Sequence, residues 1–349
     1  MPSSSKVTRE RYSRQVLFRS IGEAGQEKLA SASVAVIGCG ATGAAAAALL
    51  ARAGVGDQTS GGSLIIIDRD FVEDSNLQRQ VLFDESDARE ALPKAEAARR
   101  KIALLNSDIK VRAHVDDLTP ANIHDLLAGA DILLDATDNF ETRYLINDYA
   151  VEQRKPWIYS AAIGAYAVSM NILPGETACL ACIFPEPPGG IVETCDTAGI
   201  LNTAVNFAAS VAVTETLKYL TGAREKMRRT LLSCDLWSNE WSEVSAATPH
   251  PGCEACDLHD FHHLRGEGRP HITLCGRNSV QIHEHDRPVD FAALQARLQP
   301  HGEVRFNQLL LRFTRGEHTL TVFADGRAIV QGTTDPALAR SLYARFIGS

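Results

Sequence analysis

The chain has 349 residues, of which 45% are hydrophobic and 22% are charged, which is the composition of an ordinary globular protein. This length predicts about two domains and enough apolar residues for a sizeable buried core. The formal net charge of −8, together with the lack of a run of basic residues, argues against a protein that binds the nucleic-acid backbone.

The N-terminal segment is polar. Its first letters, "MPSSSKVTRERYSRQ", contain no apolar stretch, so we expect no signal peptide, and we interpret residues 1–32 as an N-terminal helical arm. Residues 34–51 form a run of 18 uncharged residues, which approaches the length of a membrane span. Three glycines divide this run into a strand and a helix, so we predict that no segment crosses or binds a membrane.

From residue 33 to residue 154, apolar strands alternate with helical patterns. The strands read "SVAVIG", "SLIIID", "KVRAHV" and "DILLDAT", and their nearly continuous apolar character is typical of a parallel sheet covered on both faces. Between them, segments such as "LPKAEAARRKIALLN" repeat apolar residues at helical spacing. This order predicts a doubly wound, Rossmann-like α/β domain with a mostly parallel sheet.

The alternation stops after residue 155. "PWIYSAAIG" and "AYAVSMNILPG" read as successive strands, which predicts an added antiparallel portion. A long loop rich in proline, glycine and cysteine follows at residues 178–199, and then a long, mostly apolar helix that ends at Gly222. "TLLSCDLW" reads as a further strand. We place the α/β domain at residues 33–256.

The C-terminal region begins after a linker-like segment, "RGEGRP", at residues 265–270. A strand near "ITLCGRNSVQI" is followed by a helix at "DFAALQARL" and by a hairpin with "ADGR" as a turn. The last helix is predicted at "DPALARSLYARFI". We therefore predict a small C-terminal α+β domain at residues 265–349.

The string "GCGATG", residues 38–43, follows the first strand and opens a helix, which is the context of a nucleotide-binding glycine loop. Gly38, Gly40 and Gly43 allow a tight turn, a close approach of the backbone to phosphates and a close helix–strand contact. The N–H groups and the dipole of the helix favour an anion at this position. The sequence therefore predicts nucleotide binding.

Polar side chains gather in the loop "DRDFVEDSNLQRQ" after the second strand. Asp68 ends that strand, where an acid suits the hydroxyl groups of a ribose. Asn76, Arg79 and Gln80 follow in the same loop, and Lys94 begins the next helical pattern. The two cations suit a nucleoside triphosphate better than a dinucleotide, because they neutralise charge that builds on a leaving pyrophosphate.

The carboxylate for a magnesium ion is predicted at Asp138, in "DATDN" at the end of a later strand. Mg²⁺ in ATP sites is held by one or two carboxylates and by the phosphates themselves. In open α/β sheets, ligands bind outside the carboxyl ends of the strands, where the glycine loop, Asp68 and Asp138 are all expected. The sequence thus predicts an ATP site that uses Mg²⁺.

Eight cysteines in a chain without a secretory signal favour thiols or a bound metal over disulfides, and they favour a cytoplasmic location. Two CxxC pairs, Cys179 with Cys182 and Cys253 with Cys256, offer four thiolates to a tetrahedral Zn²⁺ site. Because the pairs lie far apart in the sequence, the predicted site joins two distant segments. Cys195 precedes the long apolar helix, and a thiol near a helix N-terminus can be nucleophilic.

Together these strings resemble the ThiF/MoeB family, which is related to the ubiquitin-activating enzymes. "RYSRQ", "GCGATG", "DRDFVEDSNLQRQ", "LPKAEAA", "DATDN", the two CxxC pairs and "TCDTAG" occur in the order of that family, from about residue 9 to about residue 256. The tail, with "LCGRNSVQI" and "FADGRAIVQGT", resembles the C-terminal extension of the longer bacterial members that serve thiazole formation.

The resemblance implies an enzyme that adenylates the C-terminal glycine of a ubiquitin-like sulfur-carrier protein ending in Gly-Gly. It implies that the glycine loop and the polar loop contact ATP, that Asp68 binds the ribose and that Asp138 organises Mg²⁺. It also implies that Arg14 of "RYSRQ" reaches the phosphates from the partner subunit of a homodimer. Cys195 stands where some members carry a cysteine for sulfur transfer or covalent linkage to the carrier.

The resemblance leaves the pathway and the sulfur donor to be identified. The tail favours a carrier for thiazole formation, with a molybdopterin-type carrier as the alternative. The chain has no clear rhodanese-like domain, so we expect a separate protein to donate the sulfur. "GDQTSGGS", residues 56–63, is an insertion in the family's pattern and is expected near the rim of the cleft.

Two other classes of function also fit part of the sequence. An NAD-dependent oxidoreductase would explain the glycine loop and Asp68, but it would leave Arg79, Lys94 and the paired cysteines without a role. A non-catalytic scaffold would recruit a carrier through the cleft and the tail without forming AMP.

Overall fold

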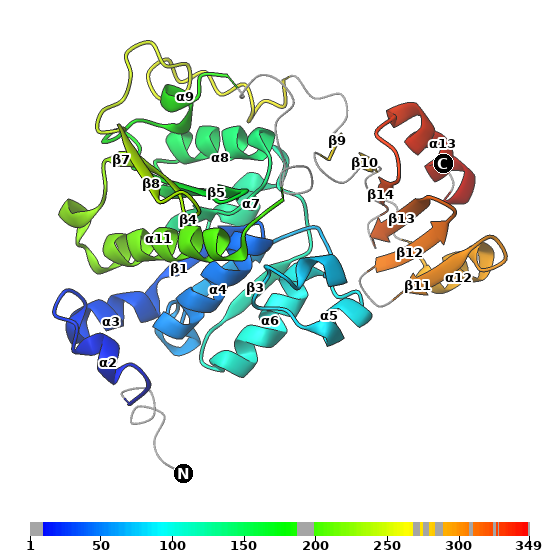
Figure 1. Ribbon diagram of the computed structural model, residues 1–349, viewed down its shortest axis with the longest axis horizontal. Coiled ribbons are helices and arrows are strands. Elements are labelled where there is room, and N and C mark those ends of the chain that lie inside the picture. The colour runs from blue at the N-terminus through cyan, green and yellow to red at the C-terminus, as the bar shows by residue number, and fades with distance from the viewer. Residues whose placement is uncertain are drawn as a thin grey trace. The chain divides into compact units, whose positions relative to one another are not determined.

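The computed structural model describes residues 10–186, 199–267, 273–274, 279–282, 289–306, 310–323, 326 and 328–347. The chain divides into two compact units, one that ends at Glu267 and a second formed mainly by the residues after it. Each unit has its own sheet and its own apolar core (Figure 1). Within the part of the chain that the structure describes, no helix combines the length and the apolar character that a membrane span requires.

The first unit is built on an eight-stranded sheet in the order β3-β2-β1-β4-β5-β6-β7-β8. The pairs from β3 to β5 are parallel, and the pairs from β5 to β8 are antiparallel. The predicted doubly wound sheet with an antiparallel portion is therefore confirmed, whereas β8 was not predicted. The strands are β1 (Ser33–Ile37), β2 (Ser63–Ile67), β3 (Val111–His114), β4 (Ile132–Asp135), β5 (Trp157–Ile163), β6 (Tyr166–Ile172), β7 (Thr230–Asp235) and β8 (Glu240–Ser245).

Helices cover both faces of this sheet (Figure 1). Those of the first unit are α2 (Ser13–Val16), α3 (Gly22–Ser31), α4 (Ala41–Ala53), α5 (Glu85–Arg89), α6 (Lys94–Leu105), α7 (Ile123–Leu127), α8 (Phe140–Glu152), α9 (Leu180–Ile183) and α11 (Asn202–Thr221). α3, α4, α6 and α11 share one core with the sheet, and α7 and α8 share the other. The long helix predicted after residue 201 is confirmed as α11, but α9 lies in a segment that we predicted to be a loop.

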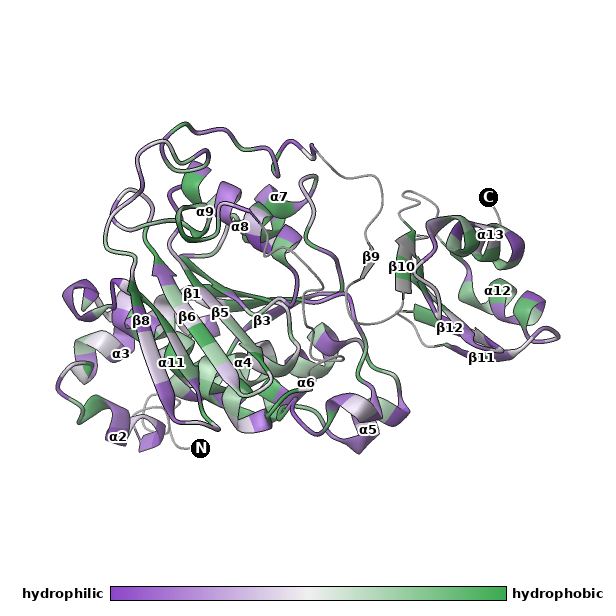
Figure 2. Cartoon of the chain, turned by 45° about the horizontal axis from the view of Figure 1, so that its top comes forward, coloured by the Kyte–Doolittle hydropathy of each residue, from purple (hydrophilic) through white to green (hydrophobic). Residues whose placement is uncertain are grey.

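The apolar strand sequences follow from this double cover. In β1, Val34 and Val36 belong to the core on the α4 side, whereas Ala35 and Ile37 belong to the core on the α8 side. A strand that is covered on both faces has no position for a solvated side chain, so it reads as an unbroken apolar run. The strands in the middle of the sheet are accordingly mostly green in Figure 2.

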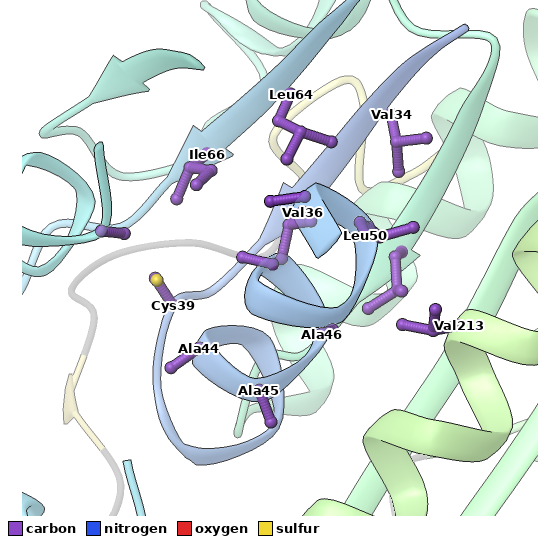
Figure 3. Packing of buried hydrophobic residues seen from close by; sticks show 14 of the residues in the cluster. Val34, Val36, Cys39, Ala44, Ala45, Ala46, Leu50, Leu64, Ile66 and Val213 are labelled. Atoms are coloured by element: carbon purple, nitrogen blue, oxygen red, sulfur yellow. The ribbon is translucent and has the colours of Figure 1, made fainter. Parts of the chain in front are cut away.

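Small residues bring α4 close to β1 and α11. Figure 3 shows alanines of α4 packed in the same cluster as Val36 of β1 and Val213 of α11. A Cβ atom added to Gly43 would lie 1.8 Å from the carbonyl oxygen of Gly38, so a larger residue would push α4 away from the strand. The start of α4 is therefore held directly at the carboxyl end of β1.

The second unit has a six-stranded antiparallel sheet in the order β11-β12-β13-β14-β10-β9. Its elements are β9 (Thr273–Leu274), β10 (Ser279–Ile282), α12 (Phe291–Leu298), β11 (Glu303–Phe306), β12 (Leu310–Arg315), β13 (His318–Phe323), β14 (Ala328–Gln331) and α13 (Pro336–Phe346). Phe313 and Val330 of the sheet share a core with Leu294 of α12 and Tyr343 of α13. The predicted α+β unit is confirmed, and β11 is an additional strand.

Candidate functional site

The glycine loop leads from β1 into α4 and leaves open space beside Gly40. Gly38 has a φ angle of +84°, a left-handed conformation that favours glycine. No side chain caps the N-terminus of α4, whose N-cap residue is Gly40. A Cβ atom added to Gly40 would meet only the Nε2 atom of Gln80, at 4.0 Å. The N–H groups at the start of the helix therefore face a space that an anion can enter.

Asp68 joins this glycine loop to the loop after β2. Its Oδ2 atom accepts a hydrogen bond of 2.6 Å from the backbone N–H of Cys39, and its Oδ1 atom accepts one of 2.7 Å from the N–H of Asp70. Burial raises the pKa of Asp68, while Lys94 and these two N–H groups oppose the rise. Each carboxylate oxygen keeps a further lone pair, so the fixed carboxylate can still accept hydrogen bonds from ligand hydroxyl groups.

The other polar residues of this loop are Asn76, Arg79 and Gln80, and they differ in their hydrogen bonds. Asn76 is buried and shapes the loop, because its Oδ1 atom accepts a hydrogen bond of 3.2 Å from the N–H of Glu73. Gln80 is 2% exposed, and its Oε1 atom has no hydrogen-bond partner among the described residues. Arg79 is half-buried and donates a hydrogen bond of 2.9 Å to the carbonyl oxygen of Ser75. Gln80 thus places its amide donor, Nε2, next to the glycine loop.

Lys94 lies at the start of α6 and is almost fully buried, with 2% of its side chain exposed. Its ammonium group lies 3.1 Å from the Oδ2 atom of Asp70, and its backbone N–H donates a hydrogen bond of 2.8 Å to the carbonyl oxygen of the same residue. We did not predict a role for Asp70 from the sequence. Asp70 is the second acid of "DRD", and a second acid directly after a buried strand is the sequence feature that could have indicated its role.

Two further ion pairs at the carboxyl edge of the sheet were also missed. Arg69 pairs with Asp117, in the loop after β3, at 2.9 Å. Burial lowers the pKa of Arg69, but the carboxylates of Asp117, Asp70 and Asp138 outweigh this effect and raise it. Charged residues from the loops after β2, β3 and β4 therefore lie close together at the carboxyl edge of the sheet.

The second missed pair holds the loop that carries Asp138. Asp135 is fully buried at the end of β4 and lies 3.5 Å from Nε of Arg143. Nη2 of Arg143 donates a hydrogen bond of 2.6 Å to the carbonyl oxygen of Thr137, and the guanidinium group lies 5.1 Å from the ring centroid of Tyr159. Asp138 itself is exposed, which leaves its carboxylate accessible.

Two predicted site residues are not part of this group. Arg14 is exposed on α2 and makes no hydrogen bond or ion pair within the described residues, although its neighbour Tyr12 is buried and hydrogen-bonded to Asn106 at 2.7 Å. Cys195 lies outside the described residues. The structure therefore brings together Gly38, Gly40, Gly43, Asp68, Gln80, Lys94 and Asp138 at one edge of the sheet, without Arg14. Asn76 and Arg79 lie in the same loop as Gln80, but their side chains bond to the backbone of that loop.

The four paired cysteines form one cluster. The Sγ atom of Cys179 lies 3.8 Å from that of Cys182 and 3.6 Å from that of Cys253, and the Sγ atoms of Cys182 and Cys256 are 3.3 Å apart. All four sulfur atoms lie within 4.8 Å of one another. Four ligands at a Zn–S distance of about 2.3 Å would be about 3.8 Å apart, so the cluster has the size of a tetrahedral zinc site.

Neighbouring groups also prepare this cluster for a cation. Asn147 of α8 donates a hydrogen bond of 3.7 Å to the sulfur of Cys179, and the N–H of His250 donates one of 3.3 Å to Cys182. Hydrogen bonds between the thiols lower the pKa of Cys182 and raise the pKa of Cys179, so only Asn147 and His250 are donors from outside the cluster. Such donors stabilise thiolates, which are the form that binds a metal.

Comparisons with known proteins agree with this geometry. The model of the ThiF family matches residues 12–255. "Sulfur carrier protein ThiS adenylyltransferase" of Bacillus subtilis is 45% identical over 343 residues, which are 97% of this chain and 99% of that protein. "SAMP-activating enzyme E1" of Haloferax volcanii is 35% identical over 71% of this chain and 88% of its own length. The solved structure of E. coli MccB with MccA-N7isoASN has a TM-score of 0.62 and 26% identity, over 71% of this chain and 74% of that chain.

Proposed function

This chain belongs to the ThiF family, and on that premise we propose that it adenylates the C-terminal carboxylate of a ubiquitin-like sulfur-carrier protein. The observation that carries the proposal is the space beside Gly40, which is bordered by the uncapped start of α4 and by Nε2 of Gln80, a hydrogen-bond donor 4.0 Å from a Cβ atom placed there. The same chain is 45% identical to a sulfur-carrier adenylyltransferase along nearly its whole length. The enzyme is thus a nucleotidyltransferase that uses ATP.

The reaction requires charge stabilisation rather than proton transfer. An oxygen of the terminal carboxylate attacks the α-phosphorus of ATP, the bond to the oxygen that bridges to the β-phosphorus breaks, and pyrophosphate leaves with the electron pair. The products are the carrier acyl-adenylate and pyrophosphate. Catalysis of such a transfer consists mainly of positioning and of cations placed around the phosphates.

The residues at the carboxyl edge of the sheet can supply both. The backbone at Gly38, Gly40 and Gly43 and the start of α4 would cradle the phosphates, and Asp68 would accept hydrogen bonds from the ribose. The cations and amides that remain for the phosphates are those of Asn76, Arg79, Gln80 and Lys94. Because Asn76 already caps its own loop, we assign the phosphate contacts to Gln80, Arg79 and Lys94.

Asp138 is the proposed carboxylate for Mg²⁺, since it is exposed at the same edge and its loop is held by Arg143. Mg²⁺ would neutralise charge on the phosphates when bound there. Arg14 is the proposed contribution of a second subunit, because it is exposed and unpaired within its own described chain. A homodimer would then complete each site.

Zn²⁺ is the proposed ion of the cysteine cluster. Cys179, Cys182, Cys253 and Cys256 match its preference for four thiolates, and they join the segment of α9 to the segment after β8. The cluster borders the core of α8, so the ion would serve as a structural link between these segments.

A carrier of the ThiS type is the proposed substrate, with a molybdopterin-type carrier as the alternative. The Bacillus protein matches 97% of this chain, which includes the C-terminal unit, whereas the Haloferax protein matches 71%. The shared C-terminal unit therefore favours ThiS, the carrier in the name of the Bacillus protein, as the type of substrate. We propose that a separate protein donates the sulfur and that Cys195 acts only after adenylation.

Exchange of labelled pyrophosphate into ATP tests the proposal directly. Purified ThiS-type and molybdopterin-type carriers ending in Gly-Gly are mixed with the enzyme, ATP and Mg²⁺, and each carrier lacking its last glycine serves as the matched control. We expect exchange with the full-length ThiS-type carrier and none with the truncated ones. Binding of a carrier without exchange would favour a scaffold, and tight NADH binding without competition by ATP would favour an oxidoreductase.

A further inference from the structure

The ammonium group of Lys94 is buried before any nucleotide is bound, and its partner is a carboxylate. Its side chain is 2% exposed, and the Oδ2 atom of Asp70 lies 3.1 Å away with 18% of that side chain exposed. The neighbouring carboxylate of Asp68 also acts electrostatically on Lys94, but the ion pair that Lys94 makes within the described residues is with Asp70. Asp70 is therefore the direct counter-ion of this lysine.

The position of Lys94 is unfavourable for a cation unless an anion is near. Lys94 is the first residue of α6, where the positive end of the helix dipole repels positive charge. A buried ammonium group also loses its hydration, so it needs a paired anion. Neither helix formation nor core packing explains a lysine here, whereas a site that receives phosphates does.

We propose that Asp70 is a positioning residue that stands in for a nucleotide phosphate: it holds the ammonium group of Lys94 in the ATP-free cleft, and a phosphate of ATP replaces it as the partner of that group. This inference rests on the proposed ATP site, but it requires no carrier protein and no turnover.

The backbone around Asp70 suits such an exchange. Its N–H donates to Asp68, and its carbonyl oxygen accepts from the N–H of Lys94. The backbone of Asp70 is thus held between Asp68 and the start of α6. Its carboxylate therefore stays beside the ammonium group of Lys94 when no ligand is present. In consequence ATP competes with an internal anion, and Asp70 lowers the affinity of the site for ATP while it keeps Lys94 in place.

The test uses the substitution Asp70→Asn, which removes the charge and keeps the shape. Asp74→Asn is the matched control, because Asp74 is exposed in the same loop. ATP affinity is measured by calorimetry without added Mg²⁺, so that no phosphate-bound metal contributes and the proposed structural zinc is kept, and thermal stability is measured with and without ATP. We expect Asp70→Asn to be less stable without ATP, to regain stability with ATP, and to bind ATP on the order of tenfold more tightly. Asp74→Asn should match the wild type.

The same substitution in a Lys94→Met protein distinguishes this role from direct repulsion between Asp70 and ATP. In Lys94→Met, which has no ammonium group, Asp70→Asn should change ATP affinity by less than about threefold and should cost no stability. An equal gain in affinity in both backgrounds would mean that Asp70 only repels ATP. A loss of affinity in Asp70→Asn would make Asp70 a direct ligand. Either result would overturn the proposal.

These outcomes are separate from those of the proposed function. A wild-type enzyme that binds ATP but exchanges no pyrophosphate would refute carrier adenylation and leave the role of Asp70 standing. An enzyme that exchanges pyrophosphate normally, but shows no coupling between Asp70 and Lys94, would refute only the present inference.

Discussion

Two glycines of the same loop should fail for different reasons when each is replaced by alanine. In Gly40→Ala, the new Cβ atom meets only Nε2 of Gln80 at 4.0 Å, but the backbone angles of Gly40, φ −77° and ψ −143°, lie outside the regions that alanine favours. The folded protein should therefore lose only about 1 kcal/mol of stability, because alanine is strained at these backbone angles but meets no close neighbour. The methyl group would, however, occupy the space that we assign to phosphate, so ATP affinity should fall by about tenfold or more.

Gly43→Ala is the contrasting variant. Its Cβ atom would lie 1.8 Å from the carbonyl oxygen of Gly38, about half of an ordinary contact distance of about 3.5 Å, and that oxygen belongs to rigid backbone. α4 must then shift from β1, and overpacking of this kind costs about 3 kcal/mol. For a protein of this size the midpoint of thermal unfolding should fall by about 4–6 °C.

Thermal unfolding followed by circular dichroism and titration of ATP by calorimetry measure both effects in both variants. The wild type is the reference, and ATP-free unfolding isolates the effect on the fold. Normal ATP binding by Gly40→Ala would refute the placement of phosphates at this loop. A wild-type unfolding midpoint in Gly43→Ala would refute the close helix–strand contact.

Further substitutions test the remaining parts of the site. Asp138→Ala should keep the fold and ATP binding without added Mg²⁺ but lose pyrophosphate exchange, whereas Cys195→Ala should retain exchange. Loss of exchange in a folded Cys195→Ala protein would contradict the assignment of this cysteine to a later step. Cys256→Ser should lose bound zinc, measured by elemental analysis, and several kcal/mol of stability, while the buried Cys234→Ser, outside the cluster, should keep the metal. Burial raises the pKa of Asp148 from 3.8 to about 6, so the native state binds this proton more tightly than the unfolded state does. The free energy of unfolding should therefore fall as the pH rises from about 4 to about 6. Denaturant unfolding at several pH values should show a smaller fall in Asp148→Asn.

Local patterns in the amino-acid sequence predicted much of the fold. The apolar runs of β1, β2 and β4 are short and continuous because both faces are covered, and this signal is contained in each strand alone. The two strands that we missed lack it. All six side chains of β8 are exposed, and β11 is also largely exposed, so neither has an apolar face to reveal it.

The candidate site shows the same division. The glycine loop and Asp68 could be predicted because their roles follow from their place after a strand and before a helix. The CxxC pairs could be predicted as ligands, since two thiols at that spacing point to a metal. Each of these inferences came from the residue types and their local spacing, without knowledge of the tertiary contacts.

Partner choice between distant segments required the folded chain. Asp70 could equally have been a solvated acid, and its pairing with Lys94 follows from the position of α6 beside the loop after β2. That one site joins the two CxxC segments was predicted, but the contact of Cys182 with Cys256 depends on how the chain returns to α9 after β8. A buried charge or thiolate is stable only with its partner in contact, and contacts between segments far apart in the chain are set by the packing of the whole core.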